Sequence, residues 1–178
     1  MGVKLGPSGL AEDLGIRGRQ DLQIVSFNLG EEYGVPISQI QEIIRIGNIT
    51  VVPNAPAYME GVINLRGKVL PVLNLRKRLS LAANGTTKKS RILVIELKGK
   101  LLGGLVDAVS HVLKVPSDSI EEPPEEIMDR ETDYITGVCK LPENLVILLD
   151  LEKLLAPLGK ENGDNGADSQ PENGVEEN

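Results

Sequence analysis

The sequence contains one histidine, His111, and one cysteine, Cys139, as candidates for nucleophilic or metal chemistry. His111 lies just before Val112 and matches Glu42 in the internal repeat described below, so its position tolerates charge and favours a surface histidine. Cys139 follows Val138 in a strand-like run, where a small apolar residue is more common than a reactive thiol. We therefore expect no catalytic residues and no enzyme activity.

Carboxylates are concentrated between residues 117 and 133, which hold eight acids and one arginine. A calcium loop needs alternating oxygen ligands and a central glycine, whereas this run contains Pro123 and Pro124 and no glycine. A solvated connection is therefore favoured over a metal site. The sequence also lacks Walker A, GxGxxG, HExxH and CxxC motifs, so we expect no metal and no cofactor.

The composition favours a β-sheet protein with few aromatic groups. Hydrophobic residues make up 40% of the 178 residues, but aromatic residues only 2%. The core must therefore consist of Val, Ile and Leu, and β-branched side chains pack well on a pleated sheet. Five of the seven net negative charges lie in residues 159–178, which leaves −2 for the rest. A nearly neutral body with few aromatic rings argues against nucleic acid as a partner.

The compartment is expected to be the cytoplasm. One cysteine excludes an intramolecular disulfide and fits a reducing environment. The N-terminus has no apolar core of signal-peptide length, and no segment reaches the roughly 20 apolar residues of a membrane helix. Direct membrane insertion is therefore not expected. Residues 1–20 and 159–178 have the composition of a flexible N-terminal segment and a disordered acidic tail.

The second half of the sequence repeats the first. Tyr58–Leu79 aligns with Tyr134–Leu155 at a constant offset of 76, and the segment from Tyr33 aligns with the segment from Leu102 at an offset of 69. We interpret these as two copies of one unit. They predict a first β-barrel subdomain at 21–81 and a second at 90–158, the latter with a short C-terminal helix.

Each unit reads as two strands, a helical turn, a proline-rich loop, a hairpin and a short helix. The three-residue spacing of Ile37, Ile40 and Ile43 favours the helical turn. The hairpin turns at Arg66 and Gly67. About five short strands form a small barrel more readily than an open sheet. Whether segments cross between the barrels is left open.

The second strand of the hairpin and the helix that follows it are also marked by particular residues. Asn74 in one copy and Asp150 in the other are suitable N-caps for the helices that follow. Pro71 has no backbone N–H, so we expect the strand Val69–Leu75 to lie at an edge of the first barrel.

The hairpin sequence GVINLRGKVLPVLNL, from Gly61 to Leu75, is the most specific motif in the chain. Together with VPNAPAYMEG before it and IQEI at Ile40–Ile43, it resembles the signature of CheW chemotaxis adaptors and of the related regulatory domain of the histidine kinase CheA. The resemblance runs from about Gln23 to Leu155. It implies two tandem SH3-like five-stranded β-barrels and a non-catalytic adaptor. The implied partners are the cytoplasmic tip of a chemoreceptor and the CheA regulatory domain, in membrane-associated receptor arrays.

The resemblance also implies two sets of contact residues. Those that would bind the receptor line a seam between the barrels, near Ile40: Glu42, Ile43, Arg66, Val109 and Val112. Those that would bind the kinase lie at the apolar edge of the first barrel: Ile49, Val51 and Val69. Each has a structural alternative, because Arg66 could brace its surroundings through Glu42 and the apolar residues could belong to the core.

Two other functions are compatible with the sequence. The chain could be a kinase regulatory domain detached from its catalytic region, although it lacks an ATP-binding or phospho-acceptor segment. It could instead be a small-ligand-binding or enzymatic β-barrel, which a deep polar pocket with convergent ionisable groups would favour.

Overall fold

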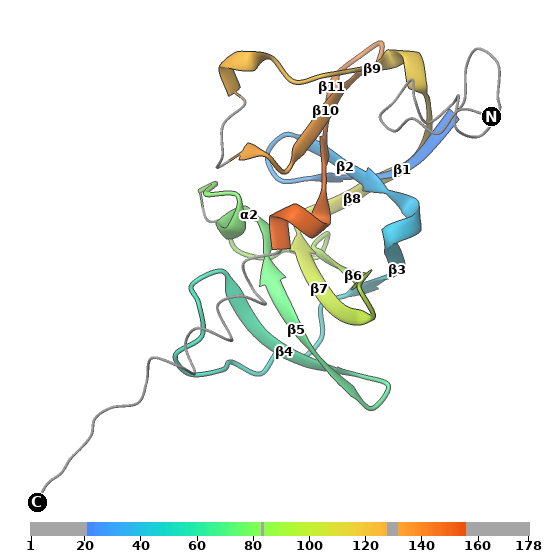
Figure 1. The fold of residues 1–178 in the computed structure, drawn as a ribbon. Helices are drawn as coiled ribbons and strands as arrows, with labels where there is room; N and C mark the ends of the chain where they lie inside the picture. The colour runs from blue at the N-terminus through green and yellow to red at the C-terminus, as the bar shows by residue number, and fades with distance from the viewer. Residues whose placement is uncertain (1–20, 83, 128–131, 156–178) are drawn as a thin grey trace, which may run out of the picture.

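The computed structural model describes residues 21–82, 84–127 and 132–155, which fold mostly into strands of two curled sheets (Figure 1). The five-stranded sheet has the order β3 (Ile40–Arg45), β6 (Arg91–Leu97), β7 (Lys100–Val106), β5 (Lys68–Asn74) and β4 (Met59–Leu65). The six-stranded sheet has the order β8 (Ala108–Pro116), β1 (Asp21–Asn28), β2 (Glu32–Pro36), β11 (Leu145–Leu149), β10 (Ile135–Lys140) and β9 (Ile120–Glu121). The helical segments are short: η1 (Ile37–Gln39), α2 (Leu75–Arg78), η2 (Ser117–Ser119), η3 (Glu125–Ile127) and residues 151–155.

The pairing of the strands confirms the repeat. In one sheet β5 runs parallel to β7, with Val72 opposite Gly103. In the other β11 runs parallel to β2, with Leu148 opposite Gly34. Both pairings follow the offsets of 76 and 69. The glycines allow the close contacts at these crossings, since a Cβ at Gly103 would lie 2.8 Å from the Ile92 side chain.

Both barrels are closed in the same way. The chain beyond β3 reaches β4 at the other edge of its sheet, where Thr50 and Val62 exchange two backbone hydrogen bonds of 2.9 Å. The chain beyond β8 passes through η2 into β9, which pairs Glu121 with Val138 on β10. Gly61 lets the first closure form, because a Cβ there would lie 2.2 Å from the Thr50 carbonyl oxygen. The predicted mainly β fold of two tandem SH3-like barrels is thus confirmed.

The barrels do not follow the predicted division of the chain. The first barrel is one continuous stretch, β3 to β7, whereas the second combines β1 and β2 with β8 to β11. The boundaries 21–81 and 90–158 separate the two sequence repeats, but β1 and β2 pair with strands of the second repeat. The hydrophobic pattern specifies which face a strand buries, not which of two equivalent partners it pairs with. The segments 1–20 and 159–178 lie outside the described residues.

The predicted helical turn is correct at Ile37–Gln39 and wrong beyond it. Ile40 and Ile43 belong to β3, where the register with β6 shifts between Ile40 and Glu42. This β-bulge adds one residue to the strand. Ile40 packs against the core and Ile43 is exposed, so the three-residue spacing does not mark one helical face. In β8, a similar register shift separates His111 from Val109.

The two barrels share their largest buried cluster. It contains strand residues of both sheets, such as Phe27 and Leu93, and residues of both short helices, such as Leu75 and Leu151. The predicted N-caps hold these helices in place: the Lys77 N–H donates to Asn74 Oδ1 at 3.1 Å, and the Lys153 N–H donates to Asp150 Oδ1 at 3.2 Å. Burial of this cluster therefore joins the two barrels into one body.

Candidate functional site

Arg66 occupies the tip of the β4–β5 hairpin. Arg66 has φ 52° and Gly67 has φ 88°, which suits a two-residue turn with positive φ at both positions. The Gly67 N–H donates to Asn64 Oδ1 at 2.8 Å and stabilises the turn. The exposed Arg66 guanidinium donates to Glu42 Oε2 on β3, and this contact raises the pKa of Arg66 above its usual value.

The Arg66–Glu42 pair spans the two edges of the first sheet, because β3 is one edge strand and the β4–β5 hairpin contains the other. The Thr50–Val62 bridge also joins the chain after β3 to β4. Arg66 therefore makes the bracing contact with Glu42 that was considered as an alternative to partner binding, and Glu42 lies on a strand. The contact leaves most of the Arg66 side chain in solvent, so a further role in binding a partner stays a prediction.

The apolar residues predicted for the seam divide into two pairs. Ile40 and Val109, on β3 and β8, pack from the two barrels against the shared cluster. Ile43 and Val112 on the same strands are exposed. The structure therefore brings the inner pair to one core and leaves the outer pair accessible to a partner.

The bulged strands are held by polar residues that the sequence analysis did not single out. Ser26 on β1 is buried, and its Oγ accepts the His111 N–H at 3.2 Å. Ser110 donates to Glu32 Oε2 at 2.8 Å, and Gln41 donates to Glu96 Oε1. One sign of these contacts was visible in the sequence: Ser26 lies inside the mainly apolar run of residues 23–29. A hydroxyl buried with such a strand requires a hydrogen-bond partner.

The strand that contains Pro71 is not an edge strand, which corrects the prediction. β5 lies between β4 and β7, but residues 68–71 pair with β4 alone and the pairing with β7 begins at Val72. The missing N–H of Pro71 therefore costs no hydrogen bond to β7. This half of the hairpin projects beyond β7 (Figure 1), which explains the exposure of Val69.

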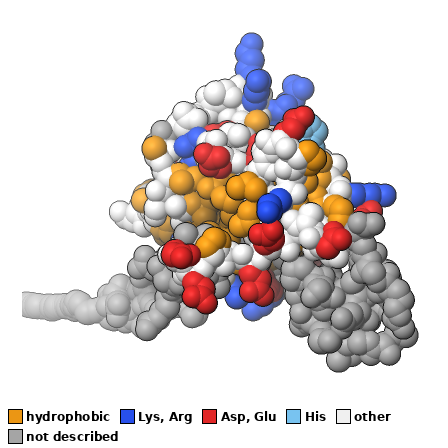
Figure 2. All heavy atoms as spheres, turned by 90° about the horizontal axis from the view of Figure 1, so that it is seen from above, with side chains coloured by type: hydrophobic (Ala, Val, Ile, Leu, Met, Phe, Trp, Pro, Cys, Tyr) orange, Lys and Arg blue, Asp and Glu red, His pale blue; other side chains and the backbone are white. Residues whose placement is uncertain are grey.

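The predicted contact residues include most of the large exposed hydrophobic side chains. In the described residues these are Ile43 at 38%, Val51 at 75%, Val69 at 70%, Val112 at 54% and Leu145 at 57% exposed. Ile49, in contrast, packs partly buried against the first barrel's own cluster. Leu145 was not among the predicted contact residues, although the offset of 76 places it over Val69. Figure 2 shows the molecule from above relative to Figure 1. Apolar side chains form a group on this face, and acidic side chains lie along the border of the group.

The two candidate reactive side chains have different environments. His111 is exposed on β8, whereas Cys139 is fully buried in β10. Burial raises the pKa of the Cys139 thiol, and the Ser119 hydroxyl lies 3.8 Å from its sulfur. A buried thiol with a raised pKa is a weak nucleophile. The described residues contain no group of three His, Cys, Asp or Glu that could hold a metal ion.

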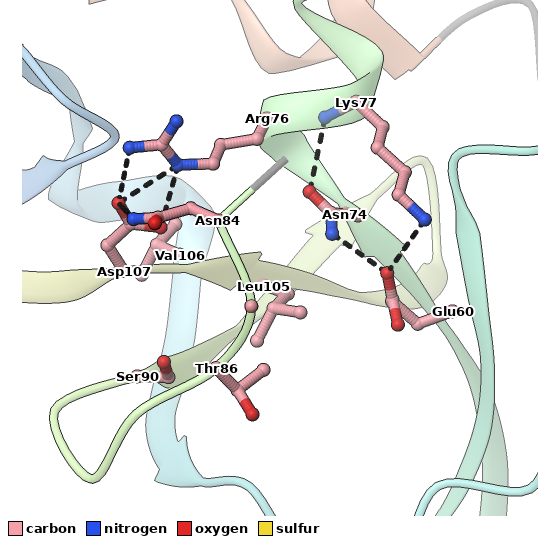
Figure 3. Close-up of a pocket in the computed structure, with 11 residues that line it drawn as sticks. Glu60, Asn74, Arg76, Lys77, Asn84, Thr86, Ser90, Leu105, Val106 and Asp107 are labelled. Atoms are coloured by element: carbon pink, nitrogen blue, oxygen red, sulfur yellow. Dashed lines mark hydrogen bonds and ion pairs between the residues drawn. The ribbon is translucent and has the colours of Figure 1, made fainter. Parts of the chain in front are cut away.

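One polar cavity of about 240 Å³ does bring ionisable groups together (Figure 3). Arg76 donates to both oxygens of Asp107 at 2.7–3.0 Å, which raises the pKa of Arg76, and the two side chains are 14% and 20% exposed. Glu60 lies 3.6 Å from the Lys77 Nζ and accepts from Asn74 at 2.8 Å. The charges at this cavity are thus paired with one another, which weakens the small-ligand interpretation.

The fold and these surfaces define a β-barrel interaction protein of the scaffold or adaptor class. A family model for the CheW-like domain matches residues 23–158, so the chain belongs to the CheW-like family. None of the helices in the described residues has the length and hydrophobicity to cross a membrane.

Named relatives cover most of the chain. It is 36% identical over 137 residues to the probable chemotaxis protein CheW of Rhizobium etli, covering 76% of this chain and 88% of that protein. It is 32% identical over 142 residues to chemotaxis protein CheW of Treponema pallidum, covering 77% and 84%. The crystal structure of scaffolding protein TtCheW from Thermoanaerobacter tengcongensis is similar with a TM-score of 0.71 and 36% identity, covering 76% of this chain and 93% of that one.

Proposed function

We propose that this protein is a chemotaxis adaptor that couples the cytoplasmic tip of a chemoreceptor to the regulatory domain of the histidine kinase CheA. It acts by binding, on the cytoplasmic side of membrane-associated receptor arrays, and turns over no substrate. The observation that carries the proposal is the exposure of four predicted contact residues, Ile43, Val51, Val69 and Val112, in a member of the CheW-like family.

The receptor surface that we propose comprises Glu42, Ile43, Arg66, Val109 and Val112. A receptor tip is helical, and an amphipathic helix binds through apolar side chains at helical spacing. Ile43 and Val112 would supply the apolar contact. Arg66 keeps donors free beside its bond to Glu42, because a guanidinium has five N–H groups.

The kinase surface that we propose comprises Ile49, Val51 and Val69 on the first barrel. Val51 and Val69 are the two most exposed large hydrophobic side chains of the described residues. Ile49 is half-buried in the first barrel's cluster, so its role there is to support the surface. Apolar side chains that lose water at the centre of an interface contribute much of its binding energy.

The test is a pair of variants with opposite effects. Val69→Asp should weaken binding of the CheA regulatory domain at least about tenfold, or 1.4 kcal/mol, because it places a charge in an apolar contact. Val112→Asp should weaken binding of a receptor-tip fragment to the same degree. Each variant should keep the other affinity within about threefold. Titration calorimetry with both partners at physiological ionic strength gives the four affinities.

Lys100→Asp is the matched control, because Lys100 is also an exposed strand residue of the first barrel and lies outside both proposed surfaces. It should leave both affinities unchanged. Equal loss of both affinities in Val69→Asp and Val112→Asp, together with loss of the folded circular dichroism signal, would show that these side chains serve the core and would refute the proposal.

A further inference from the structure

The two barrels of this molecule have opposite net charges. Residues 37–106, which contain all five strands of the first barrel, include eleven Lys and Arg but three Asp and Glu, a net charge of +8. The described residues of the second barrel, in 21–36, 107–127 and 132–155, include three Lys and thirteen Asp and Glu, a net charge of −10. The barrels occupy the lower and upper halves of Figure 1. A surface that serves only solubility mixes the two signs, so this separation indicates partners of defined charge.

Four of these cations lie together at one end of the first barrel. Arg45, the last residue of β3, is directly opposite Arg91, the first residue of β6. Like charges directly opposite each other on neighbouring strands are destabilising. Lys88 and Lys89 precede Arg91 in the turn that leads into β6, and both are exposed. We call Arg45, Lys88, Lys89 and Arg91 the cationic cluster.

The turn that contains the two lysines is fixed by hydrogen bonds. The Thr87 N–H donates to the Ser90 Oγ at 2.8 Å, and the Ser90 N–H donates to the Thr87 carbonyl at 3.1 Å. The Arg91 guanidinium donates to the carbonyls of Lys88 and Ser90, both at 2.8 Å. Because the backbone here is already ordered, a partner that binds at this turn loses little affinity to the ordering of the loop.

The cationic cluster has no acidic partner within the described part of the chain. The ion pairs found there include none of its four residues. The three acids of the first barrel bond to other residues: Glu42 to Arg66, Glu60 to Lys77 and Glu96 to Gln41. The repulsion between Arg45 and Arg91 is therefore uncompensated there, and an anionic group on a partner would relieve it.

We propose that the first barrel docks against an acidic surface of a folded protein, and that the cationic cluster steers this encounter. This rests on the proposed function, in which the partner of the first barrel is the CheA regulatory domain. Val51 of the proposed kinase surface is six residues beyond Arg45, so their Cα atoms lie within about 22 Å even in an extended chain. Charges at the rim of an apolar interface act mainly on the rate of association.

A folded acidic protein fits this charge pattern better than a nucleic acid does. The first barrel contains one aromatic residue, Tyr58, and the Arg78 guanidinium already lies 5.7 Å from the centre of its ring. Bases therefore have little aromatic surface on which to stack. The second barrel, with its net charge of −10, would repel a polyanion long enough to extend past the cluster. A local patch of carboxylates on a protein avoids this repulsion.

The test measures the association and dissociation rate constants of the CheA regulatory domain by surface plasmon resonance. Reversing both lysines, as Lys88→Glu with Lys89→Glu, should lower the association rate constant about fivefold at physiological ionic strength. The dissociation rate constant should change by less than about twofold, because the apolar contact is intact. Raising the salt concentration to about 0.5 M should remove most of the difference, because it screens the cluster.

The matched control is Lys98→Glu with Lys100→Glu, which reverses two exposed lysines at the other end of β6. The seven residues of β6 separate the two ends by about 20 Å, which exceeds the screening length of about 8 Å at physiological salt. The association rate constant of this control should stay within about twofold of the unaltered protein's. Equal decreases in both variants would overturn the proposal, because they would show an effect of overall charge.

An acidic probe gives a measurement that does not depend on the kinase. Polyglutamate peptide, titrated into the full chain and followed by NMR, should shift the amide signals of the cationic cluster and leave those of Lys98 and Lys100 unchanged. Such shifts without any binding of the CheA regulatory domain would refute the proposed function and support the acidic partner. Kinase binding with an unchanged association rate constant in the Lys88 and Lys89 variant would overturn this proposal and leave the proposed function intact.

Two other occupants of the cluster are tested in the same way. A DNA duplex of the same total charge as the peptide should shift the signals of the cluster more weakly than the peptide does. Sedimentation of the unaltered protein at low salt tests whether a second copy, with its acidic second barrel, binds there. Stronger shifts with DNA, or self-association that Lys88→Glu with Lys89→Glu abolishes, would overturn the proposal.

Discussion

At the scale of single residues, Arg66 shows how one side chain can have a structural contact and still be available to a partner. Its guanidinium bonds to Glu42 across the opening between the two edges of the first sheet, yet most of the side chain is in solvent. Exposed ion pairs contribute little to stability because water and salt screen them. The pair therefore orients Arg66 more than it stabilises the fold.

We predict that Arg66→Ala weakens binding of a receptor-tip fragment while the melting temperature stays close to that of the unaltered protein. The hairpin turn keeps its Asn64–Gly67 hydrogen bond, and the exposed pair with Glu42 adds little. Differential scanning calorimetry and receptor titration measure the two effects. Lys68→Ala, which removes an exposed cation from the same hairpin, is the control and should change neither.

Arg66→Lys refines this test, because lysine keeps the charge but loses the planar fork of donors. It should bind the receptor fragment nearly as weakly as Arg66→Ala if directional hydrogen bonds matter. Early melting of Arg66→Ala by several degrees would show that the bracing role dominates.

Residue identity predicted much of the exposure but not its full extent. His111 is exposed, as expected of a surface histidine, and Cys139 is buried in its strand. Val51 and Val69 were assigned to a surface from the resemblance, and they are exposed. Leu145 was overlooked although the repeat places it over Val69. Ile49 is half-buried because the loop after β3 folds back toward β4, a long-range event that local sequence does not encode.

At the scale of elements, the strands and the caps were predictable and the bulges were not. Asn74 and Asp150 cap their helices through their own side chains, an interaction within three residues of the chain. The bulge in β3 depends on which residue of β6 lies opposite Glu42. A three-residue spacing of isoleucines fits a helix or a bulged strand equally, so the sequence could not separate them. The place of β5 inside its sheet likewise depends on β7.

The Arg76–Asp107 pair links α2 to the connection after β7 through bonds to both carboxylate oxygens, and both side chains are mostly buried. We predict that Arg76→Lys lowers the free energy of unfolding by about 1.5–3 kcal/mol, because lysine cannot reproduce the charge-assisted bonds to both Asp107 oxygens. Urea unfolding followed by circular dichroism measures the change. The decrease in the free energy of unfolding should come mainly from weaker packing of α2 against β7.

The neighbouring Lys77→Ala provides the comparison, since the Lys77 side chain is more exposed and lies 3.6 Å from Glu60. It should cost well under 1 kcal/mol, as exposed ion pairs do. Equal effects of the two variants would mean that Arg76 contributes through general surface charge and not through its geometry.

At the scale of the whole molecule, the repeat was visible in the sequence and its three-dimensional use was not. The offsets of 76 and 69 correctly paired the hairpins and the glycine crossings of the two copies. Yet the first barrel is continuous from β3 to β7 and is inserted between β2 and β8 of the second. Two identical patterns present equivalent pairing edges, so the choice between them depends on connections and the shared core.

This arrangement predicts which fragment of the chain can fold. A fragment of residues 37–106 contains all five strands of the first sheet and its own buried cluster of Ile63, Leu70, Val72, Ile92, Val94 and Leu105. A fragment of residues 21–81 has a similar length, but its β3 lacks β6 and its β2 lacks β11. The first fragment should therefore give a strand-rich circular dichroism spectrum, dispersed amide signals and a cooperative urea transition.

The stability of the fragment 37–106 should be marginal, because it exposes its half of the shared cluster, including Leu75 and Leu93, and a small domain buries a smaller fraction of its surface than a large one. The fragment 21–81 should show no cooperative transition, because β3 has no partner strand and the sheet cannot close. Solubility tags and temperature should be matched between the two. Cooperative folding of 21–81 with a midpoint at or above that of 37–106 would mean that each repeat can close on itself, and that the pairing of β1 and β2 with the second barrel is not a requirement of the fold.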